Sequence, residues 1–184
     1  MLRRVLVVLM SLALVVGLTA CGNKKSRITH AETEGVYVDL GKLKYQVQIS
    51  RPLNAQDAED KEFLRGVSDT LGTQDTWFAV FMRVENESSR FQHPAQQYEI
   101  TDTLNNKFTP VSIDTKSNPF AYNPVGIVGK GVMPGPNSLP AQTSINGEML
   151  LFKIPRQDLD NRPLVLQIHD PSNFQTVDTV VLDV

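Results

Sequence analysis

Apolar residues recur at every second position through most of the chain after Val36, and this spacing limits the fold more than any other feature. Successive side chains of a β-strand point to opposite faces, so period-two spacing gives one buried face and one polar face. In residues 76–86 both faces are apolar until Arg83 and Glu85 make one of them polar, which predicts a central strand. Further strands are expected at residues 43–50, 98–102, 107–109, 145–154, 164–169 and 176–184.

The segments between these strands are rich in turn-forming residues. Asn105 and Asn106 tolerate the positive φ that a tight turn needs, so residues 98–102 and 107–109 are expected to form a hairpin. Only residues 58–67 show helical spacing of apolar side chains, which predicts a short helix there.

The chain has 184 residues, 41% of them hydrophobic, which is enough for one ordinary domain. Seven or eight short strands separated by Pro, Gly and Asn turns predict an all-β fold, an antiparallel immunoglobulin-like β-sandwich over residues 36–184. Cys21 is the single cysteine, so the fold contains no internal disulfide. The stability of the domain must therefore come from its core.

Four stretches carry a resemblance to a known family: 77–86, 98–102 with its hairpin to 108–110, 147–155, and 163–168. In this order they resemble the telokin-like, immunoglobulin-like extracellular domain of unknown function found in many Gram-positive lipoproteins. The resemblance covers roughly residues 43–168. The usual glycine of the hairpin turn is replaced here by Asn105 and Asn106, which leaves the turn type open. The resemblance implies a non-catalytic surface domain.

Residues 1–20 have the three-part order of an export signal. Arg3 and Arg4 precede an apolar run over residues 5–16, and small residues follow. A membrane-spanning helix needs roughly 20 apolar residues, so this run is better suited to a cleaved signal peptide. Its strongly apolar centre favours the general secretory route over twin-arginine export.

The tetrapeptide Leu18-Thr19-Ala20-Cys21 resembles the lipobox of bacterial lipoproteins. The resemblance implies that a signal peptidase recognises Leu18, Thr19 and Ala20, and that the Cys21 thiol carries a diacylglycerol. Two acyl chains give stable anchoring, whereas one chain gives only reversible binding. We therefore expect a protein anchored to the cell membrane through Cys21, on the extracytoplasmic face. The alternative is a plain secretory signal with an accidental free thiol.

Residues 21–35 are polar and lack apolar periodicity, so they are expected to form a flexible tether. A flexible chain of that length spans about 20 Å. Lys24, Lys25 and Arg27 can contact anionic lipid, at about 1 kcal/mol each, or belong simply to a solvated linker.

No sequence pattern is typical of a catalytic or metal site. His30, His93 and His169 are far apart, and the acidic residues between 57 and 62 lack the spacing and central glycine of a calcium loop. The chain has neither a Gly-x-Ser-x-Gly turn nor a P-loop, and its basic residues are scattered, which argues against nucleic-acid binding. We therefore expect no enzyme activity, no cofactor and no metal, although a hydrolase site assembled only by folding stays open.

Residues 118–144 contain five prolines and four glycines among apolar side chains. Long loops of this kind are uncommon and often functional. In one interpretation, the segment crosses between the sheets, adds an irregular edge strand and packs over the end of the sandwich. In the other, it is a partner-binding surface that uses Phe120 and Tyr122.

Together these features predict an anchored sandwich that binds protein or cell-envelope partners. The alternative is a carrier of a small molecule or metal ion, with its pocket at the sandwich end.

Overall fold

The computed structural model describes residues 26–184. One sheet is built from β1 (His30–Ala31), β5 (Tyr98–Thr101), β6 (Lys107–Phe108), β9 (Leu164–Asp170) and β10 (Asn173–Leu182). The other is built from β2 (Tyr37–Leu40), β3 (Leu43–Leu53), β4 (Asp75–Asn86), β7 (Val132–Met133) and β8 (Glu148–Pro155). The helical elements of this part of the chain are α2 (Ala58–Phe63) and two 3-10 turns (Pro140–Gln142 and Arg156–Asp160).

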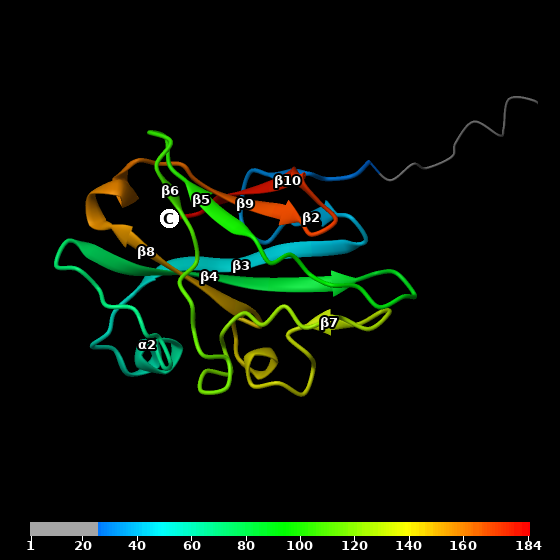
Figure 1. The fold of residues 1–184 in the computed structure, drawn as a ribbon, viewed down its shortest axis with the longest axis horizontal. Coiled ribbons are helices and arrows are strands. Elements are labelled where there is room, and N and C mark those ends of the chain that lie inside the picture. The colour runs from blue at the N-terminus through cyan, green and yellow to red at the C-terminus, as the bar shows by residue number, and fades with distance from the viewer. Residues whose placement is uncertain (1–25) are drawn as a thin grey trace, which may run out of the picture.

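The two sheets pack face to face (Figure 1). The first has the order β1-β10-β9-β5-β6, and the second has the order β2-β3-β4, with β7 and β8 sharing the outer edge of β4. The pairings are antiparallel except that of β1 with β10. Seven of the ten strands in residues 26–184 have four or more residues. The predicted antiparallel sandwich is confirmed.

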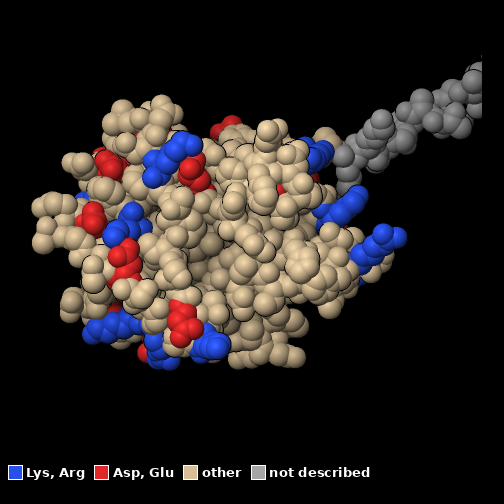
Figure 2. All heavy atoms as spheres, in the orientation of Figure 1, with Lys and Arg blue, Asp and Glu red and all other residues tan. Residues whose placement is uncertain are grey.

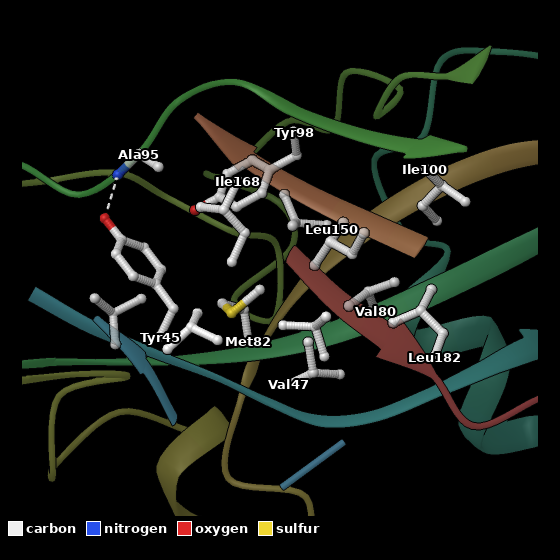
Figure 3. Packing of buried hydrophobic residues seen from close by; sticks show 14 of the residues in the cluster. Tyr45, Val47, Val80, Met82, Ala95, Tyr98, Ile100, Leu150, Ile168 and Leu182 are labelled. Carbon is white, nitrogen blue, oxygen red and sulfur yellow. Dashed lines mark hydrogen bonds between the residues drawn. The ribbon is translucent and has the colours of Figure 1, made fainter. Parts of the chain in front are cut away.

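Strand β4 is central, as predicted from its two apolar faces. It pairs with β3 along one edge and with β8 and β7 along the other. Phe78, Val80 and Met82 point into the space between the sheets, and each is fully buried. Figure 3 shows Met82 near Tyr45 and Val80 farther along the core near Leu182, a side chain of the opposite sheet. Each such side chain contributes about 1.5–3 kcal/mol through burial.

The outer face of β4 carries a second, smaller core. Phe81 on this face contacts the ring of Phe63 from α2 edge to face, with centroids 5.0 Å apart. Asp57 caps α2 by accepting hydrogen bonds from the backbone N–H groups of Glu59 and Asp60. The predicted helix is confirmed but is shorter than expected, and its role is to cover this face of the sheet.

The alternation in β3 breaks at one point. Leu43, Tyr45 and Val47 are buried as expected, but Ile49 is 36% exposed and Ser50 is buried. A register shift against β4 between Val47 and Ile49 reverses the side-chain alternation, as a β-bulge does. The period-two spacing expected over residues 43–50 would place Ile49 on the buried face with Leu43, and at Ile49 this expectation is wrong.

The hairpin between β5 and β6 forms as predicted. Asn105 has a φ of 63°, in the left-handed region that asparagine tolerates. The carboxylate of Asp102 accepts hydrogen bonds from the backbone N–H groups of Leu104 and Asn106, at 2.9 and 2.8 Å. The turn is thus fixed by a side chain that the sequence pattern did not single out.

The expected tether over residues 21–35 is too long, because the chain joins the domain well before Val36. Strand β1 lies parallel to β10, with His30 opposite Thr179, and Ala31 is only 2% exposed. The sequence did not predict this strand, because a two-residue strand with one buried side chain produces no apolar periodicity. The folded domain therefore includes residues 27–35.

Candidate functional site

The lipobox residues Leu18, Thr19, Ala20 and Cys21 lie outside the described residues. Ser26, the first described residue, follows Cys21 by five positions. No helix within residues 26–184 is long and apolar enough to cross a membrane.

Arg27 fixes the chain where it enters the domain. Its Nε donates to the backbone oxygen of Asp39 at 2.5 Å, and its Nη2 lies 3.4 Å from the Asp178 carboxylate. The next residue, Ile28, donates its N–H to the Asp39 carboxylate at 2.9 Å and accepts from the Asp39 N–H at 2.6 Å. These contacts hold the chain at one end of the sandwich, beside the end of β2.

This end, called the entry end below, is formed by five segments. They are residues 26–28, the β2–β3 turn at 41–42, the paired loops 87–92 and 127–131, and residues 171–174, which are the β9–β10 turn and the start of β10. A hollow of about 620 Å³ lies between the first loop and the β2–β3 turn, and its walls include Lys42, Lys44, Glu87 and Arg90. Lys44 lies 3.2 Å from the Glu87 carboxylate and 3.8 Å from that of Asp39. The hollow is therefore lined mainly by polar and charged groups.

Asn86 joins the two paired loops to the end of β4. Its side chain is buried, and its amide nitrogen lies 2.7 Å from the Arg90 oxygen and 3.0 Å from the oxygens of Ile127 and Val128. Its amide oxygen accepts from the Ser88 N–H at 3.0 Å. The amide group has two hydrogens for three carbonyls, so at least one hydrogen is shared.

Asp178 is a buried carboxylate beside the entering chain. Its side chain is 1% exposed, and its Oδ2 has no hydrogen-bond partner among the described residues. Burial raises the pKa of this carboxyl to about 6, and the Arg27 guanidinium offsets part of the effect. Asp178 therefore destabilises the folded state when it is ionised.

We expect Asp178→Asn to stabilise the protein at pH 7 and to reduce the loss of stability between pH 4 and pH 6. The folded-state pKa of about 6 exceeds the ordinary value of 3.8, so the folded protein binds more protons within that window. In the wild-type protein, the stability that protonated Asp178 contributes is complete below about pH 4. It is lost as the pH rises through 6, by up to about 3 kcal/mol. Urea unfolding at several pH values measures the effect, with the exposed Asp160→Asn as control. An unchanged pH dependence in Asp178→Asn would contradict this account.

Phe120, a predicted partner-binding residue, lies in the second core. It is 9% exposed, and its ring contacts that of Phe63 edge to face at 4.9 Å. The neighbouring Asn118 is fully buried and donates to the backbone oxygens of Phe63 and Arg65, at 2.7 and 2.9 Å. These contacts tie the segment to α2, so Phe120 is a packing residue.

Tyr122, the second predicted binding residue, is half-buried and packs against the buried Tyr45 and Tyr98. Its hydroxyl accepts from the Tyr98 hydroxyl at 2.6 Å and donates to the Ala95 oxygen at 2.9 Å. The Ala95 N–H donates to the Tyr45 hydroxyl at 2.8 Å (Figure 3). Burial raises the pKa of both Tyr98 and Tyr122 well above the ordinary value, so both stay neutral. The tyrosines hold the connection between β4 and β5 in place.

The packing of Phe120 and Tyr122 agrees with the packing interpretation of residues 118–144. Strand β7 is the irregular edge strand that this interpretation predicts. The segment also exposes Val125, Val128 and Leu139, which are 60%, 65% and 51% exposed. A binding role for the segment stays a prediction, and these residues, not Phe120 and Tyr122, are its accessible apolar side chains.

The histidines are not brought together. His30 lies against Thr179 and Glu32, His93 packs on the Phe91 ring, and His169 lies near the Phe174 oxygen. Within residues 26–184, no group of three or more His, Cys, Asp or Glu side chains is arranged to hold a metal ion.

Sequence reasoning missed Asn86, Asn118 and Asp178. Each is a polar residue buried beside a strand or loop end, and their patterns do not differ from those of exposed polar residues nearby. Only the folded arrangement identifies them.

No protein-family model and no curated protein matches the chain. Among solved structures, it is similar to the yjhA protein of Bacillus subtilis, with a TM-score of 0.49 and 10% identity over 83% of this chain and 99% of that chain. An uncharacterized β-sandwich protein of Clostridium difficile gives a TM-score of 0.46 at 11% identity, over 83% of this chain and 95% of that one. A functionally unknown protein of Listeria monocytogenes gives 0.45 at 11% identity, over 83% and 82%. At these identities the likeness concerns the fold alone.

Proposed function

We propose that the protein is a membrane-anchored lipoprotein whose β-sandwich binds protein or cell-envelope partners outside the cytoplasm, without catalysis. The observation that carries this proposal is the Leu18-Thr19-Ala20-Cys21 sequence at the end of a short apolar run. A diacylglycerol on Cys21 supplies the two acyl chains that stable anchoring requires.

The short link between anchor and domain supports a role at the membrane surface. Arg27, which is fixed to the domain, follows Cys21 by only six positions. Six residues span at most about 20 Å even when fully extended. The entry end of an anchored domain therefore stays close to the lipid headgroups.

The opposite end of the sandwich is then left free for partners. The β5–β6 turn lies there, away from the side on which the N-terminal chain leaves (Figure 1). Leu104 in this turn is 67% exposed. A domain held by its entry end presents this turn away from the membrane.

Cys21→Ala tests the anchor. We expect the wild-type protein to incorporate labelled palmitate and to fractionate with membranes. The variant should incorporate none, because it lacks the acceptor thiol, and should keep residues 1–20. Ser26→Ala serves as a matched control and should behave as wild type. Palmitate incorporation that persists in Cys21→Ala, or is absent from wild type, would contradict the proposal.

Crosslinking in intact cells tests the binding part with the same variant. We expect wild type and Ser26→Ala to form a defined crosslinked species that the Cys21→Ala protein does not form. Equal crosslinking by all three proteins would show that partner binding does not depend on the anchor.

A further inference from the structure

Large apolar side chains are exposed around the entry end. Of the nine such side chains in residues 26–184, four lie there: Ile28, Phe91, Val128 and Phe174, which are 43%, 54%, 65% and 55% exposed. The Phe91 ring lies over Gly126, where an added Cβ would come within 1.6 Å of the ring. One side of the Phe91 ring therefore packs on the backbone of the neighbouring loop, and about half of the side chain stays exposed.

The loops that carry these side chains are adjacent. Gln92 and Ile127 form a β-bridge, which brings the 87–92 and 127–131 loops together. The β9–β10 turn joins them, because Pro171 and Ser172 line the same small hollow as Gln92. The four apolar side chains thus come from neighbouring segments rather than from scattered positions.

Basic side chains surround the same loops. Lys42, Arg90 and Lys130 are exposed, and Lys130 donates to the backbone oxygen of Glu87. Neither Lys42 nor Arg90 forms an ion pair within the described part of the chain, whereas the Glu87 carboxylate lies against Lys44. Figure 2 shows Lys and Arg side chains beside the point where the N-terminal chain leaves, with few acidic side chains among them, whereas the Lys and Arg side chains on the opposite side are interspersed with Asp and Glu.

We propose that the entry end docks onto the headgroup region of an anionic membrane. The basic residues then contact acidic headgroups, and the exposed apolar side chains enter the boundary with the acyl chains. The inference rests on the proposed function, because the anchor at Cys21 must lie in the same membrane. The short link and the two exposed basic residues without ion pairs in residues 26–184, Lys42 and Arg90, favour lipid over a protein partner here. Each charged contact strengthens docking about fivefold.

Depth-dependent quenching tests the docking. A fluorophore is attached to Val128→Cys or to Leu104→Cys in the full lipidated protein, whose own Cys21 thiol is blocked by the diacylglycerol. Both parent residues are exposed and apolar, at 65% and 67%, and they lie at opposite ends of the sandwich. In vesicles of phosphatidylcholine and phosphatidylglycerol with a nitroxide-labelled lipid, we expect strong quenching at position 128 and little at position 104.

Charge variants identify the cause. We expect the double variant Lys42→Gln with Arg90→Gln to weaken docking by about 25-fold, because each charge removed costs about fivefold. Lys61→Gln with Arg156→Gln removes one lysine and one arginine, both exposed, at the other end, and should leave quenching unchanged. Vesicles of phosphatidylcholine alone should also reduce the quenching at position 128.

The outcomes separate the two proposals. Protein that does not float with vesicles contradicts the anchor itself, and the docking inference falls with it. Protein that floats but shows equal quenching at positions 128 and 104 overturns the docking inference alone. The docking inference is also overturned if quenching is stronger at position 128 but does not depend on the charge variants or on the lipid charge. The short link to Cys21 would then be enough to explain why position 128 lies near the membrane.

Discussion

Replacing Phe120 by Ser is expected to lower the free energy of unfolding by about 3–5 kcal/mol. The Phe120 ring is 9% exposed and packs on Phe63 in the second core. Truncation of a buried phenylalanine removes its buried area and leaves a cavity, which costs about that much. The serine hydroxyl adds a polar group to apolar surroundings, so the effect should not be smaller than that of alanine.

Urea unfolding of Phe120→Ser measures the effect, with Val128→Ser as control. Val128 lies in the same segment but is 65% exposed, so its substitution should change the stability by no more than about 0.5 kcal/mol. If both variants are as stable as wild type, Phe120 is not a core residue. The interpretation of Phe120 as a partner contact would then be restored.

Asn86→Asp is expected to destabilise the protein by about 3–5 kcal/mol at pH 7. The substitution keeps the shape of the side chain but replaces an amide donor by a carboxylate. That carboxylate would face the backbone oxygens of Arg90, Ile127 and Val128 in a buried position. An uncompensated buried charge lowers the free energy of unfolding by about 3–5 kcal/mol.

The control for this variant is Asn137→Asp, which makes the same chemical change at an exposed residue. Hydrogen exchange on both proteins shows where stability is lost. We expect faster exchange in the 87–92 and 127–131 loops of Asn86→Asp, since this side chain joins them. Equal stability and equal exchange in the two variants would mean that Asn86 does not organise the entry end.

The strands and the hairpin were predictable because their signals are local. Alternation within residues 76–86 depends only on which face each side chain takes, and Asn105 and Asn106 carry their turn preference by themselves. The central position of β4 followed from its two apolar faces, because only a strand covered on both sides buries both of them.

The rest depends on contacts between distant parts of the chain. The exposure of Ile49 results from a bulge against β4, and the burial of Ala31 results from pairing with β10. The sequence left open whether Phe120 packs or binds, because it gives no sign that α2 covers the outer face of the sheet. Among the candidate site residues, Cys21 is predicted from the sequence alone, and the structure adds the entry end, which begins five residues after it.

Intact-protein mass spectrometry of the chain extracted from membranes tests the central claim most directly. The account predicts a mature chain that begins at Cys21 and carries a diacylglycerol on the thiol of that residue. A chain that retains residues 1–20, begins at another residue, or carries Cys21 as a free thiol would contradict the account.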